Sequence, residues 1–309
     1  MKVNDPWKFR FLVLAGFVFC ALAFLGAYHT LTAQSTSAED DMAGKGAYFF
    51  TAPCIPEQLS FAGEEIPLEV YWVKESLDRE LIAVCNQHTL TMLSMKRSGR
   101  YFPMIEQILK EEGLPDDFKY LCVAESNLQN VVSPAKAAGF WQFMEKTAKL
   151  YGLEVREEVD ERYNLEKATH AACKYLKGSR ARLGSWSLAA AAYNMGEAGV
   201  KRNMTEQGRD NYWDLYLNSE TARYMYRILA YKLVFENPER YHFKLFPQDY
   251  YAPIPCDTVR VDTTISSFYD FASSQNITYK EFKELNPWLR AKRLTVSGKD
   301  YTIKIPKNS

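Results

Sequence analysis

Apolar residues recur every three or four positions across most of residues 67–237, the spacing of the buried face of an α-helix. The first such stripe consists of Val73, Leu77, Leu81, Val84 and Cys85. Further helices are predicted over 101–109, 165–183, 187–193 and 221–235, with stops at Gly113 and Asn237-Pro238. Because no clear β-hairpin interrupts this span, we predict a mainly α fold, with an all-helical domain over residues 67–247.

The pattern changes after Pro247, where short segments replace the long helical stripes. Residues 258–261 and 301–305 are predicted strands, and 266–272 and 279–285 are predicted short helices. Asn286-Pro287 is a natural stop for the second helix. We therefore predict a separate β-α-α-β module over residues 253–307.

The N-terminus carries a long uncharged segment. Lys2, Lys8 and Arg10 precede Phe11 to Tyr28, eighteen residues without a charge. That length suits a transmembrane helix, and the basic flank favours a cytoplasmic tail at 1–10, an anchor at 11–28 and export of the rest. A signal cleaved at Ala33-Gln34 is the alternative. Residues 29–66 show no regular spacing of apolar residues and are predicted to be a linker.

Composition excludes several classes of function. The 309 residues contain 38 Lys and Arg and 38 Asp and Glu, so no bulk charge favours nucleic acid. The four histidines do not cluster and no Cys-x-x-Cys pair occurs, so we expect no metal and no cofactor. Export would permit disulfides, but the five cysteines beyond the apolar segment show no disulfide framework. Three of them lie in helical stripes and are expected to be buried thiols: Cys85, Cys122 and Cys173.

Glu125 is the leading candidate for chemistry. A helix is predicted to begin after Gly113 with Pro115 in its first turn, and Glu125 continues its apolar stripe one turn after Leu121. Burial disfavours the charged carboxylate, so the pKa of Glu125 should rise toward that of a general acid. The alternative is a structural carboxylate that pairs with a buried Arg or Lys, or that turns to water.

Three further clusters bear on this choice. The first is Gly139-Phe140-Trp141-Gln142, where Gly139 permits a close backbone approach and Gln142 offers a donor and an acceptor. The second is Ala192-Tyr193-Asn194-Met195-Gly196, at the expected C-terminal end of a helix. The third is Tyr224 on the long aromatic helix. Each alone has an ordinary structural explanation, either core packing or a helix cap.

Together with Glu125-Ser126, and in this order, these motifs resemble the lysozyme-like lytic transglycosylases of the soluble, goose-type superfamily, over residues 68–235. One departure is Glu145, where the family usually has a proline. The resemblance implies a lysozyme-like fold and cleavage of the β-1,4 bond between N-acetylmuramic acid and N-acetylglucosamine in peptidoglycan glycan strands, with 1,6-anhydro ends as the product. It implies Glu125 as the single catalytic acid and base, and Ser126, Gln142, Tyr193, Asn194 and Tyr224 as substrate-binding residues.

Two alternatives remain at this point: a muramidase that uses water, and a non-catalytic peptidoglycan-binding protein.

The C-terminal module resembles a divergent LysM domain through Asp262-Thr263, 285–287 and 301–306, although Val261 replaces the usual glycine. The alternative is a purely structural appendage. The resemblance and the N-terminal segment together imply that the protein lies in the bacterial envelope, either anchored in the inner membrane or released into the periplasm. The acids of 154–161 are expected to be solvated, and most of Trp141, Trp186 and Trp213 to pack in the core.

Overall fold

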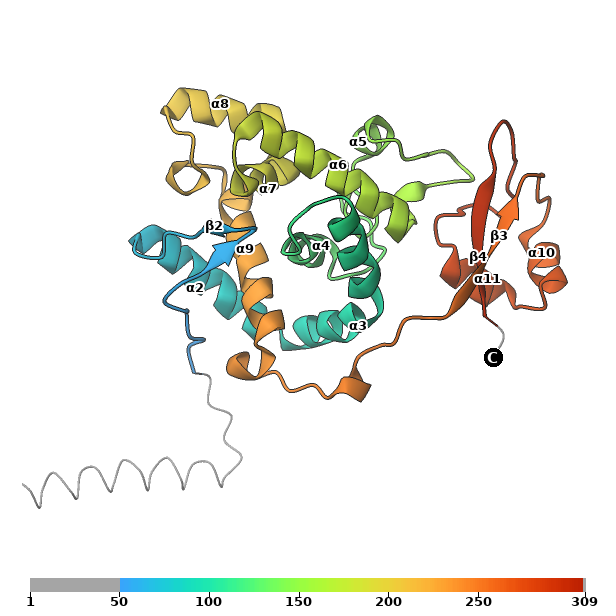
Figure 1. The fold of residues 1–309 in the computed structure, drawn as a ribbon, viewed down its shortest axis with the longest axis horizontal. Helices are drawn as coiled ribbons and strands as arrows, with labels where there is room; N and C mark the ends of the chain where they lie inside the picture. The colour runs from blue at the N-terminus through green and yellow to red at the C-terminus, as the bar shows by residue number, and fades with distance from the viewer. Residues whose placement is uncertain (1–50, 308–309) are drawn as a thin grey trace, which may run out of the picture. The chain divides into compact units, whose positions relative to one another are not determined.

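A computed structural model of the chain describes residues 51–307 and shows a helical body followed by a small two-stranded module (Figure 1). The body contains α2 (Tyr71–Asn86), α3 (His88–Glu111), α4 (Phe118–Ser126), α5 (Glu145–Leu150), α6 (Leu165–Leu183), α7 (Trp186–Met195), α8 (Glu197–Gln207) and α9 (Ser219–Glu236). The mainly α prediction is confirmed. None of the helices within residues 51–307 is long and apolar enough to cross a membrane, and the predicted anchor at 11–28 lies outside the described residues.

The helical body is organised around α9, which packs against α2, α4 and α7. Figure 1 shows the short helix α4 in the middle of this body, with α3 beside it. Phe118, Leu121, Cys122 and Val123 of α4 are fully buried. The buried alanines of α7, residues 189–192, have only a methyl group each, so neighbouring helices can approach closely. Trp141, Trp186 and Trp213 are all buried, as expected from core packing.

Two helices differ from their predicted bounds. Helix α4 begins at Phe118, because residues 115–117 form a turn in which the Phe118 N–H donates to the Pro115 carbonyl at 3.3 Å. Helix α3 begins at His88 and continues through Pro103, well before the predicted start at 101. The early part of α3 buries small polar residues instead of a continuous apolar stripe. Thr91 Oγ1 donates to the Val84 carbonyl at 2.7 Å, which satisfies a hydroxyl that periodicity alone would assign to solvent.

The predicted linker at 29–66 is too long at its C-terminal end. Strands β1 (Ser60–Phe61) and β2 (Glu64–Glu65) form a small antiparallel hairpin that belongs to the helical body. Phe61 is fully buried and packs edge-on against Phe118, with ring centroids 5.2 Å apart. The carboxylate of Glu64 accepts from the backbone N–H groups of Trp186 and Ser187 at 2.5 and 3.0 Å, where it stabilises the N-terminus of α7.

The C-terminal module has the predicted β-α-α-β order: β3 (Cys256–Val261), α10 (Phe268–Ser274), α11 (Tyr279–Leu285) and β4 (Tyr301–Pro306). The two strands pair antiparallel, with Val259 opposite Ile303. Phe268, Phe282 and Ile303 are fully buried between strands and helices. Asn286, also buried, ends α11 and donates from Nδ2 to the Lys304 carbonyl at 2.7 Å, which joins the helix end to β4.

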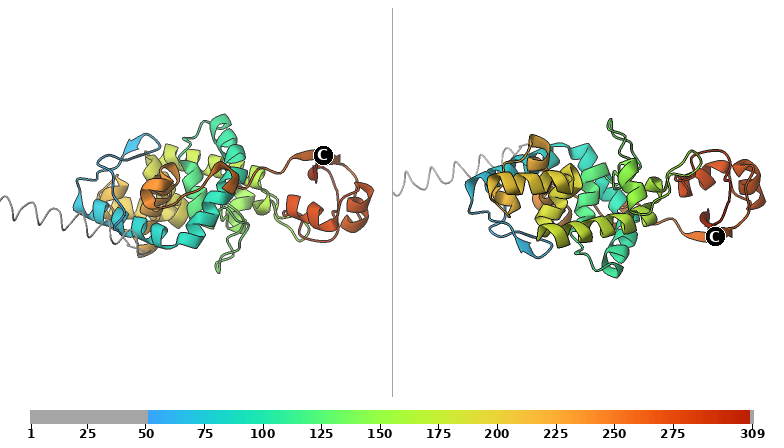
Figure 2. Two further views of the ribbon diagram at one scale, coloured as in Figure 1. Left: turned by 90° about the horizontal axis from the view of Figure 1, so that it is seen from below. Right: turned by 90° about the horizontal axis from the view of Figure 1, so that it is seen from above.

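The module packs against the loop between α5 and α6, as two further views of the chain show (Figure 2). Val159 of this loop pairs with Leu289 of the module in an antiparallel bridge, and the Asp160 N–H donates to the Trp288 carbonyl at 2.8 Å. Val159 and Tyr163 belong to the same buried apolar cluster as the module's own core. The module and the helical body therefore share part of one core.

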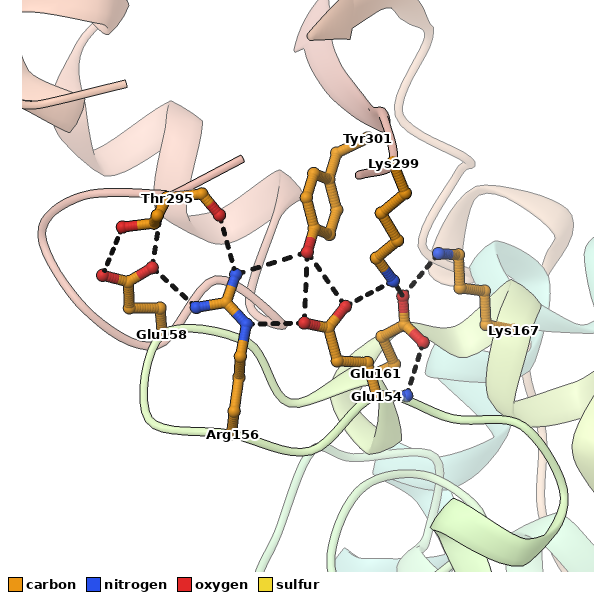
Figure 3. Close-up of polar contacts among 8 residues, drawn as sticks. All are labelled: Glu154, Arg156, Glu158, Glu161, Lys167, Thr295, Lys299 and Tyr301. Carbon is orange, nitrogen blue, oxygen red and sulfur yellow. Dashed lines mark hydrogen bonds and ion pairs between the residues drawn. The ribbon is translucent and has the colours of Figure 1, made fainter. Parts of the chain in front are cut away.

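The expectation of solvated acids over 154–161 is wrong for the residues that face this contact. Glu158, Asp160 and Glu161 are buried, and Figure 3 shows the polar network that surrounds two of them. Arg156 donates from Nη1 to Glu158 at 2.6 Å and from Nε to Glu154 at 2.5 Å. These carboxylates lose water, but cations and amide N–H groups replace it.

The same network reaches across to the module. Glu158 accepts from the Thr295 N–H at 2.8 Å, and Glu154 accepts from the Tyr301 hydroxyl at 3.0 Å (Figure 3). Glu158 also accepts from Arg293 Nε at 2.9 Å. The hydrogen bond from Arg156 is the main cause that lowers the pKa of Glu158 to about 2. The loop carboxylates thus act as acceptors for donors that lie more than 130 residues away in the sequence.

Gly139 packs closely against the backbone of Arg162, and this contact can be tested. Its φ of +83° is left-handed, and a Cβ there would lie 1.9 Å from the Arg162 carbonyl oxygen. We expect Gly139→Ala to lower the free energy of unfolding by about 3 kcal/mol or more, because strain and overlap add. Gly152 has a similar φ of +89° with no atom within 4 Å of its Cβ position, so Gly152→Ala should cost only about 1–2 kcal/mol. Denaturant unfolding of both variants measures the difference, and equal losses would contradict the close approach.

Candidate active site

Glu125 lies in the last turn of α4, which ends at Asn127 with a left-handed φ of 52°. Its side chain is partly buried between α4 and α9. The hydroxyl of Tyr224, a side chain only 2% exposed, donates to Glu125 Oε1. No Lys or Arg among residues 51–307 forms an ion pair with Glu125. The structural ion pair considered as an alternative is therefore absent from this part of the chain.

The protonation of Glu125 reflects opposing influences. Burial is the largest and raises the pKa to about 7, from 4.5 for an ordinary glutamate. The hydrogen bond from Tyr224 and the charge of Arg227 lower the pKa, and the negative charge of Glu220 raises it. Because burial dominates, the side chain holds a proton up to neutral pH while a hydroxyl fixes its orientation. Glu125 thus meets the requirement for a general acid near pH 7.

Ser126 and Gln142 both bind backbone carbonyls. The buried Ser126 hydroxyl donates to the Phe140 carbonyl at 2.8 Å and so joins the end of α4 to the loop that carries the second motif. Gln142 adopts a left-handed φ of 48°, and its Nε2 donates to the carbonyls of Gly139 at 2.7 Å and Val131 at 3.0 Å. These contacts position the loop beside Glu125. The assignment of both residues to substrate binding stays a prediction.

Tyr193 and Asn194 extend the same arrangement to α7 and α9. The Tyr193 hydroxyl donates to the Trp141 carbonyl at 2.7 Å, next to the carbonyl that Ser126 binds. Asn194 Oδ1 accepts from Thr221 Oγ1 at 2.7 Å. Thr221 lies on α9, three residues before Tyr224. Gly196 ends α7 with a φ of 82°, as predicted for a cap. The fold thus brings all four sequence motifs into one connected group around Glu125, while sugar contacts by Tyr193 and Asn194 stay predictions.

Two residues that influence Glu125 were missed at the sequence level. Glu220 and Arg227 lie four residues before and three residues after Tyr224 on α9, which places all three on one face of the helix. Their charges act on Glu125 in opposite directions. Helical spacing from Tyr224 could have identified both, once Tyr224 was assigned to the site.

The described cysteines and acids do not form an alternative centre. Within residues 51–307 no group of three or more His, Cys, Asp or Glu side chains could hold a metal ion. All five cysteines of that part are free thiols. Cys122 and Cys173 are buried as expected, and Cys85 is partly buried. Glu125 is therefore the site's main candidate for acid–base chemistry.

Two family models match parts of the chain. Residues 102–216 match the transglycosylase SLT domain, a stretch that contains Glu125, Ser126, Gln142, Tyr193 and Asn194. Residues 257–309 match the soluble lytic transglycosylase C-terminal LysM-like domain, so the predicted LysM resemblance of the module is confirmed at the family level. Tyr224 lies beyond the matched part of the SLT domain and joins it through the hydrogen bond to Glu125.

Two relatives extend the similarity beyond the domain. The chain is 26% identical over 257 residues to the membrane-bound lytic murein transglycosylase D of Escherichia coli K12, and equally to the protein of the same name from Escherichia coli O6:H1. Each alignment covers 80% of this chain and 55% of the relative. The chain thus spans little more than half the length of either relative.

The raised pKa of Glu125 predicts a pH-dependent stability. Between 4.5, its ordinary value, and about 7, the folded state binds more protons than the unfolded state, so the free energy of unfolding falls as pH rises through this window. Glu125→Gln removes this term. We expect the free energy of unfolding of the variant, measured relative to that of the wild type, to increase by on the order of 3 kcal/mol from pH 4 to pH 8. Urea unfolding across this range measures the gain, with Glu206→Gln, exposed on α8, as the control. Parallel stability curves for wild type and Glu125→Gln would contradict the raised pKa.

Proposed function

We propose that this chain is a lytic transglycosylase that cleaves the β-1,4 bond between N-acetylmuramic acid and N-acetylglucosamine in peptidoglycan. The observation that carries the proposal is Glu125, a partly buried carboxyl with a pKa of about 7 inside an SLT domain, oriented by Tyr224. The names of the two relatives, both lytic murein transglycosylases, support the same reaction class.

One carboxyl group is sufficient for this reaction if the nucleophile belongs to the substrate. Glu125 gives its proton to the glycosidic oxygen as the bond from that oxygen to C1 of the muramic acid breaks. The 6-hydroxyl of the same sugar then attacks C1, and the ionised Glu125 accepts the hydroxyl proton. The bond between O6 and C1 closes a 1,6-anhydro ring, no water is consumed, and Glu125 returns to its protonated form. Intramolecular attack benefits from the proximity of the two groups.

The surrounding residues have roles consistent with this path. Tyr224 positions the carboxyl and stabilises its ionised form between the two proton transfers. Gln142, Tyr193 and Asn194 are proposed to hold the sugar and its acetamido group, and Ser126 to keep the Phe140 loop in place. The LysM-like module is proposed to bind glycan strands. With the segment 11–28 as an anchor or signal, the domain would act in the periplasm.

The muramidase alternative requires a second carboxylate that activates water. Glu220 is the candidate for that role, because its charge acts on Glu125. Its Oε1 lies 3.5 Å from Asn194 Nδ2, within reach of the proposed sugar site. The two mechanisms therefore make different demands on Glu220 and yield products that differ by one water molecule.

Loss of the proton donor should abolish the reaction. We expect Glu125→Gln to reduce release of muropeptides from sacculi by about 10³-fold or more, because general acid catalysis alone contributes roughly 10²–10⁴-fold and the return proton transfer is lost as well. Glu197→Gln, which removes a carboxyl paired with Arg182 outside the Glu125 group, serves as the matched control and should retain activity. Mass spectrometry of wild-type products should show anhydro ends. Reducing ends would favour the muramidase, and lytic activity in Glu125→Gln would refute an enzyme that depends on this acid.

The pH dependence of kcat/KM should follow the ionisation of free Glu125. Activity should fall above about pH 7, since the acid must be protonated. Tyr224→Phe removes a hydrogen bond that lowers the pKa of Glu125, so the fall in kcat/KM on the alkaline limb should move to higher pH. Glu220→Gln removes a charge that raises the pKa, so its limb should shift downward while anhydro products persist. Rates measured from pH 5 to 9 test both shifts; limbs that stay in place, or that move together, would contradict the assigned electrostatics.

A further inference from the structure

A concave surface lies next to the Glu125 group, and we define it here as the basic groove. It has a volume of about 720 Å³, in the range of ligand sites. One wall comes from α3 and from residues 128–131, which follow α4 directly; the other comes from α11 and the start of the loop after it. Both the SLT domain and the LysM-like module therefore contribute to the basic groove.

The basic groove concentrates positive charge. Five cations line it, against one carboxylate, Glu284: Arg97, Arg100, Lys280, Lys283 and Arg290. None of these five forms an ion pair with a carboxylate anywhere in residues 51–307. By contrast, the neighbouring Arg156, Arg293 and Lys299 all pair with glutamates. In a chain with equal numbers of acidic and basic residues, this accumulation of unpaired cations is a local feature.

The unpaired charge also affects the groove itself. Burial, and then the nearby charge of Arg290, lower the pKa of Lys283. Tyr101 and Phe140 form an apolar side of the basic groove, with ring centroids 4.7 Å apart and an edge-on contact. Arg100 lies over the ring of Tyr251, 5.5 Å from its centroid. The surface thus offers cations beside aromatic rings, which suits a ligand that carries carboxylates on a partly apolar backbone.

The walls of the basic groove are held in place. The loop carboxylates of Figure 3 join the module to the helical body, and the Arg290 N–H donates to the Glu158 carbonyl at 2.8 Å. On the other side, residues 250–252 cross α3 at Gly99, where the Tyr251 N–H donates to the Lys96 carbonyl at 2.8 Å and Arg100 Nε to the Ala252 carbonyl at 3.0 Å. A groove between fixed walls can bind a ligand without first ordering its own elements.

The basic groove is joined to the candidate active site through two short contacts. Arg97 Nη1 donates to the carbonyl of Asn127, two residues after Glu125, at 3.2 Å. Val131, which lines the groove, accepts through its carbonyl from Gln142 at 3.0 Å. A polymer bound at Glu125 could therefore extend a side branch into the basic groove.

We propose that the basic groove binds the carboxylates of the peptide stems that branch from muramic acid on a peptidoglycan strand. This inference rests on the proposed function, because it assigns the substrate's anionic branch to a surface beside Glu125. Peptide-bearing strands would then be preferred over bare glycan, and the LysM-like module would contribute to substrate selection through α11.

The first experiment compares two substrates: peptide-bearing glycan strands and the same strands stripped of peptides by an amidase. We expect the full-length double variant Lys280→Gln/Arg290→Gln to show a roughly tenfold higher KM on peptide-bearing strands, with kcat unchanged, and no change on stripped strands. The matched control is Lys201→Gln, which removes an exposed cation on α8 outside the groove. Because Arg290 also packs on Tyr163, Lys280→Glu, an exposed single reversal, repeats the test independently.

Equal KM changes on both substrates, or none on either, would overturn the inference.

A second experiment distinguishes this inference from the proposed function. A soluble stem peptide with free carboxylates is titrated into the Glu125→Gln protein, and binding is measured by calorimetry. Binding that weakens severalfold in about 0.3 M salt and in Lys280→Glu supports the groove even if no anhydro product is ever found. No detectable binding of the peptide would refute the groove while the cleavage reaction could still stand.

Discussion

The site depends on the competition between burial of the Glu125 carboxyl and the hydrogen bond that Tyr224 donates to it. Burial disfavours charge and raises the pKa to about 7, while the Tyr224 hydroxyl and Arg227 limit that rise. Without burial the group would be ionised at neutral pH and could not donate a proton. Without the hydroxyl it would lack both a fixed orientation and a stabilised anion. The packing of α4 against α9 maintains both conditions at once, because it removes water and brings Tyr224 into reach.

The loop between α4 and α6 links this site to the rest of the chain through its backbone carbonyls. Successive carbonyls of Gly139, Phe140 and Trp141 accept from Gln142, Ser126 and Tyr193, so each motif is held by another. The loop itself is held from behind by Arg162, whose Nη1 donates to the Phe143 carbonyl at 3.2 Å and whose guanidinium pairs with Asp160. Such a buried pair adds little net stability, but it fixes geometry that an apolar pair could not.

Sequence periodicity predicted the parts of the fold whose contacts are local. Helices α6 and α11 have the predicted bounds, 165–183 and 279–285, because apolar stripes and caps lie within a few residues of each end. Periodicity missed the early part of α3 because its buried hydroxyls donate to backbone carbonyls. The acids of 154–161 were wrongly predicted to be solvated because their hydrogen-bond partners come from the distant module. The apolar pattern of its own helix predicted the burial of Glu125. No periodic pattern predicts its contact with Tyr224, 99 positions further along the chain, and only the family resemblance brought the two residues into one site.

Charge pairing divides the contact between the helical body and the module into two regions. On one side, Glu154, Glu158 and Glu161 are acceptors for Arg156, Arg293 and Lys299, and the contact is closed. On the other side, where α3 faces α11, the cations have no carboxylate partners within residues 51–307, and the surface is hollow. The first region uses the loop before α6 and residues 293–299, whereas the second uses α3 and α11. Salt bridges therefore hold the module in place in the first region, while four of the five cations of the second donate only to backbone carbonyls. A module that served only as an appendage would need the first region and would gain nothing from the second, since unpaired like charges repel.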